Sequence, residues 1–207
     1  SWSSYSTMPS GKFINLRAKA FNDSDLLIDA LSKEGEKWVF TAKNALKSRK
    51  RFSGGVLEPI NFVEIFYTES KSGYYYIQEA KVIEDFPELR KNYQKLQWAF
   101  HFLKMISKGT REGLGDNKSL FDLLGNSLNT LQTCNNPLHL KLHFEIKFLY
   151  YLGFLDLNED TSEFVARPVS ENHKIHLTDE EFSFIDQKTK KLLKEMDLTL
   201  REEFDSL

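Results

Sequence analysis

A dense group of cations lies in the first third of the chain. Positions 43 to 51 hold five basic residues and no acidic one: Lys43, Lys47, Arg49, Lys50 and Arg51. Such a cluster repels itself, and its natural partner is a polyanion such as a phosphate backbone. The formal net charge of the chain is only −2, so these cations are concentrated rather than spread. The cluster predicts a nucleic-acid-binding loop, with a solvated loop between two strands as the alternative.

Two further cations and several aromatic rings lie near this cluster in the sequence. Residues 12–21 alternate between apolar and polar, which places Arg17 and Lys19 on the solvent face of a predicted strand. The nearby aromatic residues are Trp38, Phe40, Phe52, Tyr67, Tyr74, Tyr75 and Tyr76. Bases stack on exposed rings without sequence preference, although the core is the commoner place for any single ring.

The histidines give a weaker signal, for a metal site. His139 and His143 are four residues apart on a predicted helix with Glu145 beside them, but the His-Glu-x-x-His order is absent. We therefore expect both to be structural. The pair His173 and His176 has no cysteine near it, and we predict no metal and no cofactor.

Nothing in the sequence predicts catalysis. Cys134 precedes a predicted helix start, which can lower a thiol pKa, but no base is identifiable beside it, so we interpret it as structural. A P-loop, a nucleophile elbow and a dinucleotide-binding glycine motif are all absent. We predict that the protein is not an enzyme and has no catalytic residue.

Composition narrows the class of protein. The chain has 207 residues, of which 41% are hydrophobic, and its 17 Phe and 8 Tyr are typical of packed globular structure. A single cysteine excludes an internal disulfide and favours a reducing compartment, the cytoplasm. No apolar run approaches the roughly 20 residues that cross a bilayer, so we expect no membrane contact. The Ser-rich residues 1–11 predict a flexible arm, and the last quarter of the chain is acidic.

Five short β segments are predicted within residues 12–85. They are residues 12–21, 26–31, 37–42, 61–67 and 74–83, with a polar hairpin connection at 68–73. Alternation in the first segment places Ile14 and Leu16 on one face and Asn15 on the solvent face. Five short strands suggest a small closed barrel.

Helical periodicity begins at Pro87. A predicted apolar stripe runs through Leu89, Tyr93, Leu96, Phe100 and Leu103. Further helices are predicted over 119–131 and 137–153, and the second is apolar nearly all round, as at the centre of a bundle. Residues 158–172 are polar and irregular, and Thr178 with Glu181 forms a capping box that opens a last helix. The predicted fold class is α+β, with a five-stranded barrel over 12–85 and an all-α domain over 86–207.

Several short motifs follow one another in a distinctive order. They are Phe21-Asn22-Asp23-Ser24-Asp25, Lys37, Ala42-Lys43-Asn44-Ala45, the basic run ending in Arg51-Phe52, and Gly54-Gly55-Val56-Leu57-Glu58-Pro59. Downstream motifs are Phe86-Pro87-Glu88-Leu89-Arg90, residues 120–124 and residues 144–154. Together they resemble the family of the bacterial recombination mediator RecO, over roughly residues 12–157.

The resemblance implies an OB-fold barrel followed by a helical domain. It implies binding of single- and double-stranded DNA, strand annealing, and a nucleoid-associated role beside RecR and the single-strand-binding protein in loading the recombinase RecA. By position, the cluster at 43–51 is the family's basic loop, and Arg90 and Lys91 match basic positions at the junction helix. The site for the single-strand-binding protein is expected in the helical domain, and our candidates for it are Lys104, Lys141 and Lys147.

The sequence also departs from the family pattern. Residues 155–177 contain no cysteine, so we expect an irregular segment without zinc in place of the four-cysteine knuckle of many members. Asp29 and Asn44 replace residues that are usually not acidic or are Gly. Two other functions stay open: an adaptor whose basic barrel grips an acidic peptide without annealing, and, more remotely, a nuclease or other metal enzyme.

Overall fold

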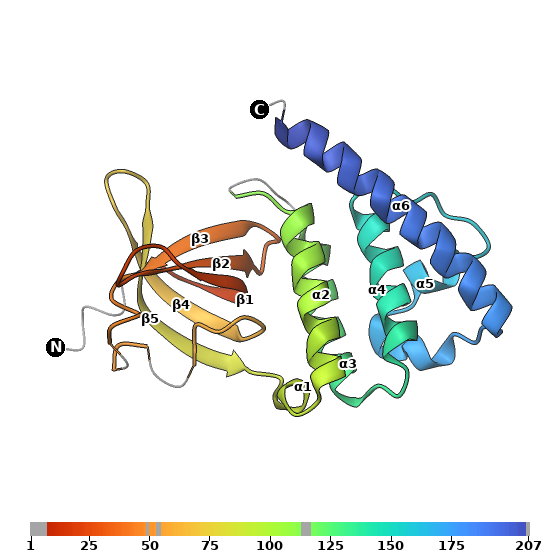
Figure 1. Ribbon diagram of the computed structural model, residues 1–207, viewed down its shortest axis with the longest axis horizontal. Coiled ribbons are helices and arrows are strands. Elements are labelled where there is room, and N and C mark those ends of the chain that lie inside the picture. Colours follow the sequence, from red (N-terminus) through yellow and green to blue (C-terminus); the bar gives the residue numbers. More distant parts are fainter. Residues whose placement is uncertain (1–7, 49, 53–54, 113–116, 206–207) are drawn as a thin grey trace. The chain divides into compact units, whose positions relative to one another are not determined.

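The computed structural model describes residues 8–48, 50–52, 55–112 and 117–205, with the side chains of the last two residues excepted (Figure 1). The chain divides into two compact units. The barrel unit comprises Ser1–Phe86 and Thr110–Phe121, and the helical unit comprises Pro87–Gly109 and Asp122–Leu207.

Five strands form the closed barrel of the first unit (Figure 1). They are β1 (Ser10–Ala20), β2 (Leu26–Ser32), β3 (Lys37–Ala42), β4 (Phe62–Glu69) and β5 (Tyr75–Glu84), in the closed order β1-β2-β3-β5-β4. Of the five strand pairings described, only the short β3–β5 pairing is parallel. This is a five-stranded OB-fold, and the predicted fold class is confirmed.

Strand β1 differs from its prediction in two respects, the residue at which it begins and the burial of Asn15. Ser10 and Gly11, assigned to the flexible arm, belong to β1 and pair with β4, because closing the barrel requires a partner for that edge. Pro9 of the predicted arm also accepts from the Tyr67 N–H at 3.0 Å, and residues 1–7 lie outside the described residues. Asn15 was predicted to face solvent and is fully buried. The β1–β2 register shifts between Asn15 and Arg17, so strict alternation fails at this point.

Buried Asn15 has a structural task. Its amide Nδ2 donates to the carbonyls of Val56 and Glu58, at 3.1 and 3.2 Å. These bonds join β1 to the end of the long β3–β4 connection. A polar residue inside the barrel thus positions the connection that carries the basic loop.

The helical unit contains six helices and one 3-10 segment in its described part (Figure 1). They are α1 (Pro87–Arg90), α2 (Tyr93–Gly109), α3 (Lys118–Thr133), α4 (Pro137–Tyr151), α5 (Ser162–Ala166), η1 (Val169–Lys174) and α6 (Asp179–Asp205), with the first residues of α3 assigned to the barrel unit. Helix α4 contacts α2, α5, η1 and α6, which confirms its predicted central position. The capping box is also present, because the backbone N–H groups of Thr178 and Glu181 each donate to the other's side chain at 3.1 Å.

The predicted stripe after Pro87 is confirmed at Leu89 and Leu103, which are buried, and is wrong at Tyr93 and Phe100. Tyr93 and Phe100 are 75% and 46% exposed, whereas Ala99 and Phe102 are fully buried. The helix is interrupted at residues 91–92, and α2 begins after Asn92, whose side chain accepts from the Lys95 N–H at 3.1 Å. The segment 155–177, expected to be irregular, forms two short helical pieces, α5 and η1, too short to show a period in sequence.

Candidate nucleic-acid interface

The basic loop leaves β3 directly and is anchored at its start. Asn44 has φ 60°, a left-handed conformation that favours Gly and that Asn tolerates. Its N–H donates to the Asp25 carboxylate at 2.9 Å, and the N–H of Leu46 donates to the Ser24 carbonyl at 2.9 Å. The bond from the Asn44 N–H is the main cause of the lowered pKa of Asp25, followed by that from Asn22. The loop is therefore tied to the β1–β2 connection.

The loop cations project into solvent. Lys43, Lys47, Lys50 and Arg51 are exposed, and none of these four forms an ion pair with another residue that the structure describes. Arg49 lies outside the described residues. Lys43 lies over the Tyr76 ring, with 4.7 Å from Nζ to the ring centroid. The Arg51 guanidinium lies 5.3 Å from the Phe52 ring centroid and donates to the Ile77 carbonyl at 3.4 Å. The positive charge of the described loop is thus available to an external anion.

A groove of about 510 Å³ lies beside the loop. Leu27 of β2 and Val39 and Thr41 of β3 contribute to its lining, together with Tyr76 of β5. Leu27 pairs with Thr41, and Thr41 pairs with Tyr76, so one outer face of the barrel carries these side chains. In OB-folds the β2–β3 face and the loops after β1 and β4 bind oligonucleotides.

Two exposed rings come from those two loops. Phe21 follows β1 and is 62% exposed, and Tyr74 precedes β5 and is 63% exposed. Both line the groove together with Lys43. Such rings are suited to stacking on bases, while the adjoining loop is suited to phosphates. The carboxylates of Asp25 and Glu112 also line the groove.

Sequence reasoning did not identify Phe21 as a site residue. Of the seven rings it named, Phe40 is fully buried, and Trp38, Phe52, Tyr67 and Tyr75 pack against the barrel core. The Trp38 ring, for example, lies 4.7 Å from the Tyr75 ring and 5.7 Å from the Phe40 ring, centroid to centroid. The available signal for Phe21 was its place at a strand end, immediately before the polar turn at 22–25.

The remaining predicted DNA contacts are exposed but dispersed. Arg17 and Lys19 lie on the solvent side of β1, and Arg17 pairs in register with Asp29. Arg90 and Lys91 are exposed in the helical unit, where Lys91 donates to the Glu88 carboxylate at 3.0 Å.

The three lysines predicted for partner binding lie in different environments. Lys104 is exposed on α2. The Lys141 ammonium is 2.7 Å from the buried Glu145 carboxylate, which also lies 3.3 Å from His101. Lys147 is only 6% exposed, and its ammonium donates to the Val165 carbonyl at 3.1 Å. Burial lowers the pKa of Lys147. Two of the three are thus engaged within the helical unit.

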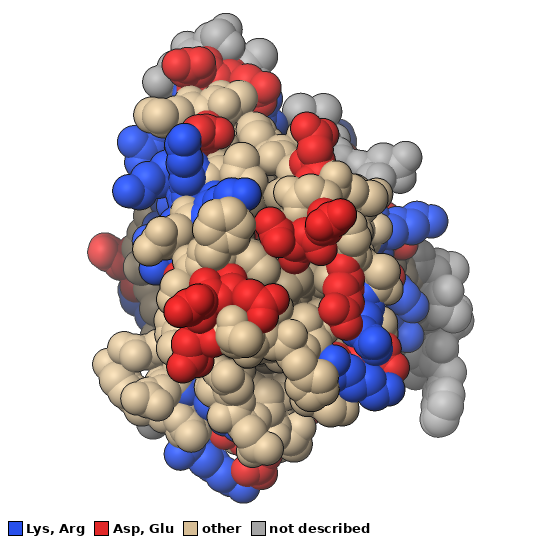
Figure 2. Space-filling model, turned by 90° about the vertical axis from the view of Figure 1, so that its right-hand side faces the viewer, with Lys and Arg blue, Asp and Glu red and all other residues tan. Residues whose placement is uncertain are grey.

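The helical face that carries α5 and α6 is electrostatically mixed. Figure 2 shows acidic and basic side chains next to one another on this face, with acidic groups gathered near its middle. It therefore offers no continuous basic surface comparable with the loop of the barrel.

His143 occupies a structural position, as the sequence predicted. His143 is fully buried and hydrogen-bonded, and burial raises the pKa of the Cys134 thiol. Within the described ranges, no group of three or more His, Cys, Asp or Glu side chains is arranged to hold a metal ion. None of the helices in those ranges is long and apolar enough to cross a membrane.

Comparison with known proteins matches both units of the chain. Residues 8–86 match the family model described as Recombination protein O N terminal, and residues 90–163 match Recombination protein O C terminal. The DNA repair protein RecO of Desulfosudis oleivorans is 30% identical over 143 residues, which are 68% of this chain and 54% of that protein. Its counterpart in Maridesulfovibrio salexigens is 28% identical over 144 residues, 69% of this chain and 58% of that protein.

The RecO of Syntrophus aciditrophicus is 27% identical over 140 residues, covering 67% of this chain and 53% of that protein. The chain thus spans little more than half the length of these curated relatives. The matches follow the order of the two units described above, barrel first and helices second. This chain belongs to the RecO family.

Proposed function

We propose that this protein binds DNA in recombinational repair, anneals complementary strands and helps to load recombinase. The observation that carries the proposal is the position of Lys43, which starts the basic loop and also lines the aromatic groove. One surface of the barrel thereby offers cations for phosphates and rings for bases. The proposal includes no catalytic step and no cofactor.

The charges of the groove favour one orientation of the strand. Asp25 and Glu112 line the groove, and their carboxylates repel phosphates. The strand therefore lies with its bases in the groove, against Phe21 and Tyr74, and its phosphates over the loop. Arg17 and Lys19 extend the positive surface along β1, and Arg90 and Lys91 are further candidate contacts in the helical unit.

Annealing requires that two strands approach each other despite their charge. Loop cations neutralise phosphates and release counterions, which lowers the electrostatic cost of bringing a second strand to the same surface. Stacking holds bases unpaired without reading their identity, so any complementary strand is acceptable. In this proposal the partners are RecR and the single-strand-binding protein, with exposed Lys104 as the remaining accessible candidate for contact, in a bacterial cytoplasm at the nucleoid.

An annealing assay tests the proposal. Complementary labelled oligonucleotides are mixed with the full chain, and duplex formation is followed by energy transfer between the labels. We expect acceleration that depends on the loop cations and weakens with salt. Absence of acceleration, with stable single-strand binding, would remove annealing and leave a DNA-binding protein.

The same surface also suits an acidic peptide with an aromatic side chain, because the groove has an apolar floor. A competition titration separates the two functions. The adaptor function requires that an acidic peptide displaces the oligonucleotide from the barrel and that annealing is absent.

A further inference from the structure

A separate cavity of about 510 Å³ lies in the helical unit, where the end of α3, the start of α4 and the residues around η1 meet. Three of the five histidines of the chain line it, namely His139, His173 and His176, together with Cys134. The rest of its polar lining consists of Thr and Asn side chains, and its described lining contains no Asp, Glu, Lys or Arg. A cavity of this size is typical of small-molecule sites.

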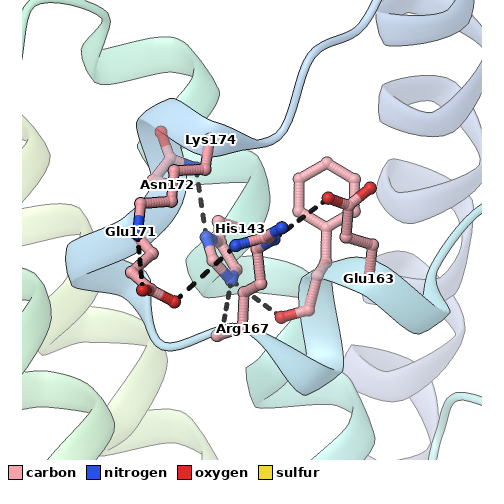
Figure 3. Close-up of polar contacts among 7 residues, drawn as sticks. His143, Glu163, Arg167, Glu171, Asn172 and Lys174 are labelled. Carbon is pink, nitrogen blue, oxygen red and sulfur yellow. Dashed lines mark hydrogen bonds and ion pairs between the residues drawn. The ribbon is translucent and has the colours of Figure 1, made fainter.

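A buried hydrogen-bond relay sets the tautomer of the histidine that faces this cavity. The relay begins at His143, whose Nε2 lies 2.7 Å from the Phe164 carbonyl and 3.0 Å from the Arg167 carbonyl (Figure 3). Carbonyl oxygens only accept, so Nε2 carries the hydrogen. Burial lowers the pKa of His143 to about 4, so the ring is neutral near pH 7 and its Nδ1 is an acceptor.

Asn172 transmits this constraint to His139. Its Nδ2 donates to His143 Nδ1 at 3.1 Å and to the His139 carbonyl at 3.2 Å, which fixes the orientation of the amide. Its Oδ1 then faces His139 Nδ1 at 2.8 Å, so that Nδ1 carries a hydrogen. His139 Nε2 is the nitrogen left for the cavity, and it has no hydrogen-bond partner among the residues described.

A proton taken up by Nε2 turns His139 into a cation whose Nδ1–H bond to Asn172 is retained. The groups packed around this ring do not neutralise it. The Phe164 ring of α5 and the Phe182 ring of α6 lie 6.0 and 6.3 Å away, centroid to centroid. The Cys134 thiol has a raised pKa. The nearest acid described on η1, Glu171, is already bound to the Lys174 ammonium at 2.9 Å and lies 3.8 Å from the Arg167 guanidinium.

The acids in the first turn of α6, Asp179, Glu180 and Glu181, are exposed and do not line the cavity. His143 on α4 is neutral, and His173 and His176 on the other wall are exposed histidines. Burial raises the pKa of Cys134, and the positive charge of Lys95 on α2 opposes this rise without cancelling it. The Lys95 ammonium donates to the Gln132 carbonyl at 3.0 Å. An imidazolium in this cavity therefore lacks a protein counter-ion and favours an anion from solution.

We propose that this cavity binds a phosphomonoester and that binding is coupled to uptake of one proton by His139. The three histidines and the threonine hydroxyls supply donors for a tetrahedral oxyanion. The volume exceeds what a bare phosphate fills, and buried Ile175 with half-buried Leu177 offers an apolar wall to a sugar-sized group. A free nucleotide and a phosphorylated DNA end share this chemistry. The site is independent of the barrel groove and of the function proposed for it.

Calorimetric titration of the full chain with a deoxynucleoside 5′-monophosphate tests the proposal. Repeating the titration in two buffers of different ionisation enthalpy measures proton uptake. We expect uptake of about one proton on binding, and an affinity that falls as the pH rises. Inorganic phosphate should bind with the same pH dependence, and the unphosphorylated deoxynucleoside should not bind.

Variants separate a specific site from general attraction. His139→Gln should abolish proton uptake, and the double change of exposed residues His173→Gln and His176→Gln should weaken binding near pH 6 about tenfold, the effect of about 1.4 kcal/mol. His101→Gln, outside the cavity, is the matched control and should leave binding unchanged. Absence of saturable binding near pH 6, or binding without proton uptake in the folded wild-type chain, would overturn the proposal.

The source of the phosphate is identified by oligonucleotides with and without a 5′-phosphate. A gain in affinity on phosphorylation that disappears in the His173 and His176 double variant assigns the cavity to a DNA end. An unchanged affinity, with the mononucleotide still bound, assigns it to a free nucleotide.

Discussion

At the scale of single residues, exposure divides the aromatic side chains of the barrel into two roles. Phe40 and its neighbours build the core, whereas Phe21 and Tyr74 stand at the groove with more than half of their surface exposed. Both exposed rings line the same groove, which favours stacking on bases as their role.

Replacing Phe21 and Tyr74 by Leu tests this division. Leucine retains apolar contact but removes the flat ring, so each change should weaken single-strand binding by about 1–3 kcal/mol, measured by fluorescence anisotropy. Tyr93→Leu is the control, because Tyr93 is 75% exposed in the helical unit. Equal losses in all three variants would show that stacking in the groove is not responsible.

The cations of the basic loop should determine how steeply the DNA-binding constant falls with salt concentration. Changing Lys47, Arg49, Lys50 and Arg51 to Ala should flatten the dependence of log binding constant on log salt by roughly 2–3, since each phosphate contact on a single strand contributes about 0.7. The slope is measured by titration at several salt concentrations.

Exposed cations of the helical unit supply the control for the loop. Lys188, Lys190 and Lys191 lie exposed on α6. Their replacement by Ala should leave the slope unchanged if phosphates bind the loop. An equal flattening by both sets would indicate general attraction to positive charge.

At the scale of elements, polar side chains of the central helix hold the segment that follows it. His143 and Lys147 of α4 donate to the carbonyls of Phe164, Val165 and Arg167, at and just beyond α5 (Figure 3 for His143). These donors satisfy the C-terminal carbonyls of a helix of five residues that is too short to be stable alone. Side-chain hydrogen bonds thus order a segment that contains no cysteine.

The depressed pKa of His143 predicts a stability that depends on pH. Its folded pKa is about 4, against an ordinary value near 6.5, so the unfolded chain binds this proton first as pH falls. The contribution of His143 to the free energy of unfolding is therefore complete above pH 6.5 and falls by roughly 3 kcal/mol as the pH is lowered to 4. Urea unfolding at several pH values measures it.

Two variants isolate this contribution. His143→Leu should remove the part of the pH dependence due to this group and lower stability at neutral pH by about 2–4 kcal/mol, because the Phe164 and Arg167 carbonyls lose their donor. His176→Gln, an exposed histidine, should do neither. A pH profile identical in wild type and His143→Leu would contradict the assignment.

At the scale of the whole molecule, the chain leaves the barrel unit at Phe86 and returns to it at residues 110–121. Within the barrel unit, the centroid of the Phe121 ring lies 5.6 Å from that of the Phe62 ring, and the backbones of Lys37 and Glu112 form an isolated parallel β-bridge. Gly35 has φ +89°, and an added Cβ would lie 2.1 Å from the Asn117 carbonyl oxygen. The barrel therefore includes a segment that follows α2 in the sequence.

Phe121→Ala should accordingly destabilise the barrel. Phe121 is 8% exposed, and its truncation should cost about 3 kcal/mol of unfolding free energy. Trp38, which packs against the barrel core, reports this unfolding when the other two tryptophans are replaced by Phe. Phe184→Ala, at a residue 51% exposed, should change stability by less than about 0.5 kcal/mol. Equal effects would show that residues 110–121 do not stabilise the barrel.

The sequence alone determined the order of the strands and of the longer helices, the closed barrel, the central helix and the place of the basic loop. These follow from hydrophobic period, turn residues and local charge, which are properties of neighbouring positions. The capping box at Thr178 is predictable for the same reason, because both of its partners lie within one helical turn.

Only the tertiary structure decided which side chains share a surface. The burial of Asn15 and the burial of Lys147 each depend on contacts with segments distant in sequence. The same holds for the groove, which combines Phe21, Thr41, Tyr74 and Glu112 from four parts of the chain. Local patterns specify what an element is, whereas long-range packing specifies what it faces.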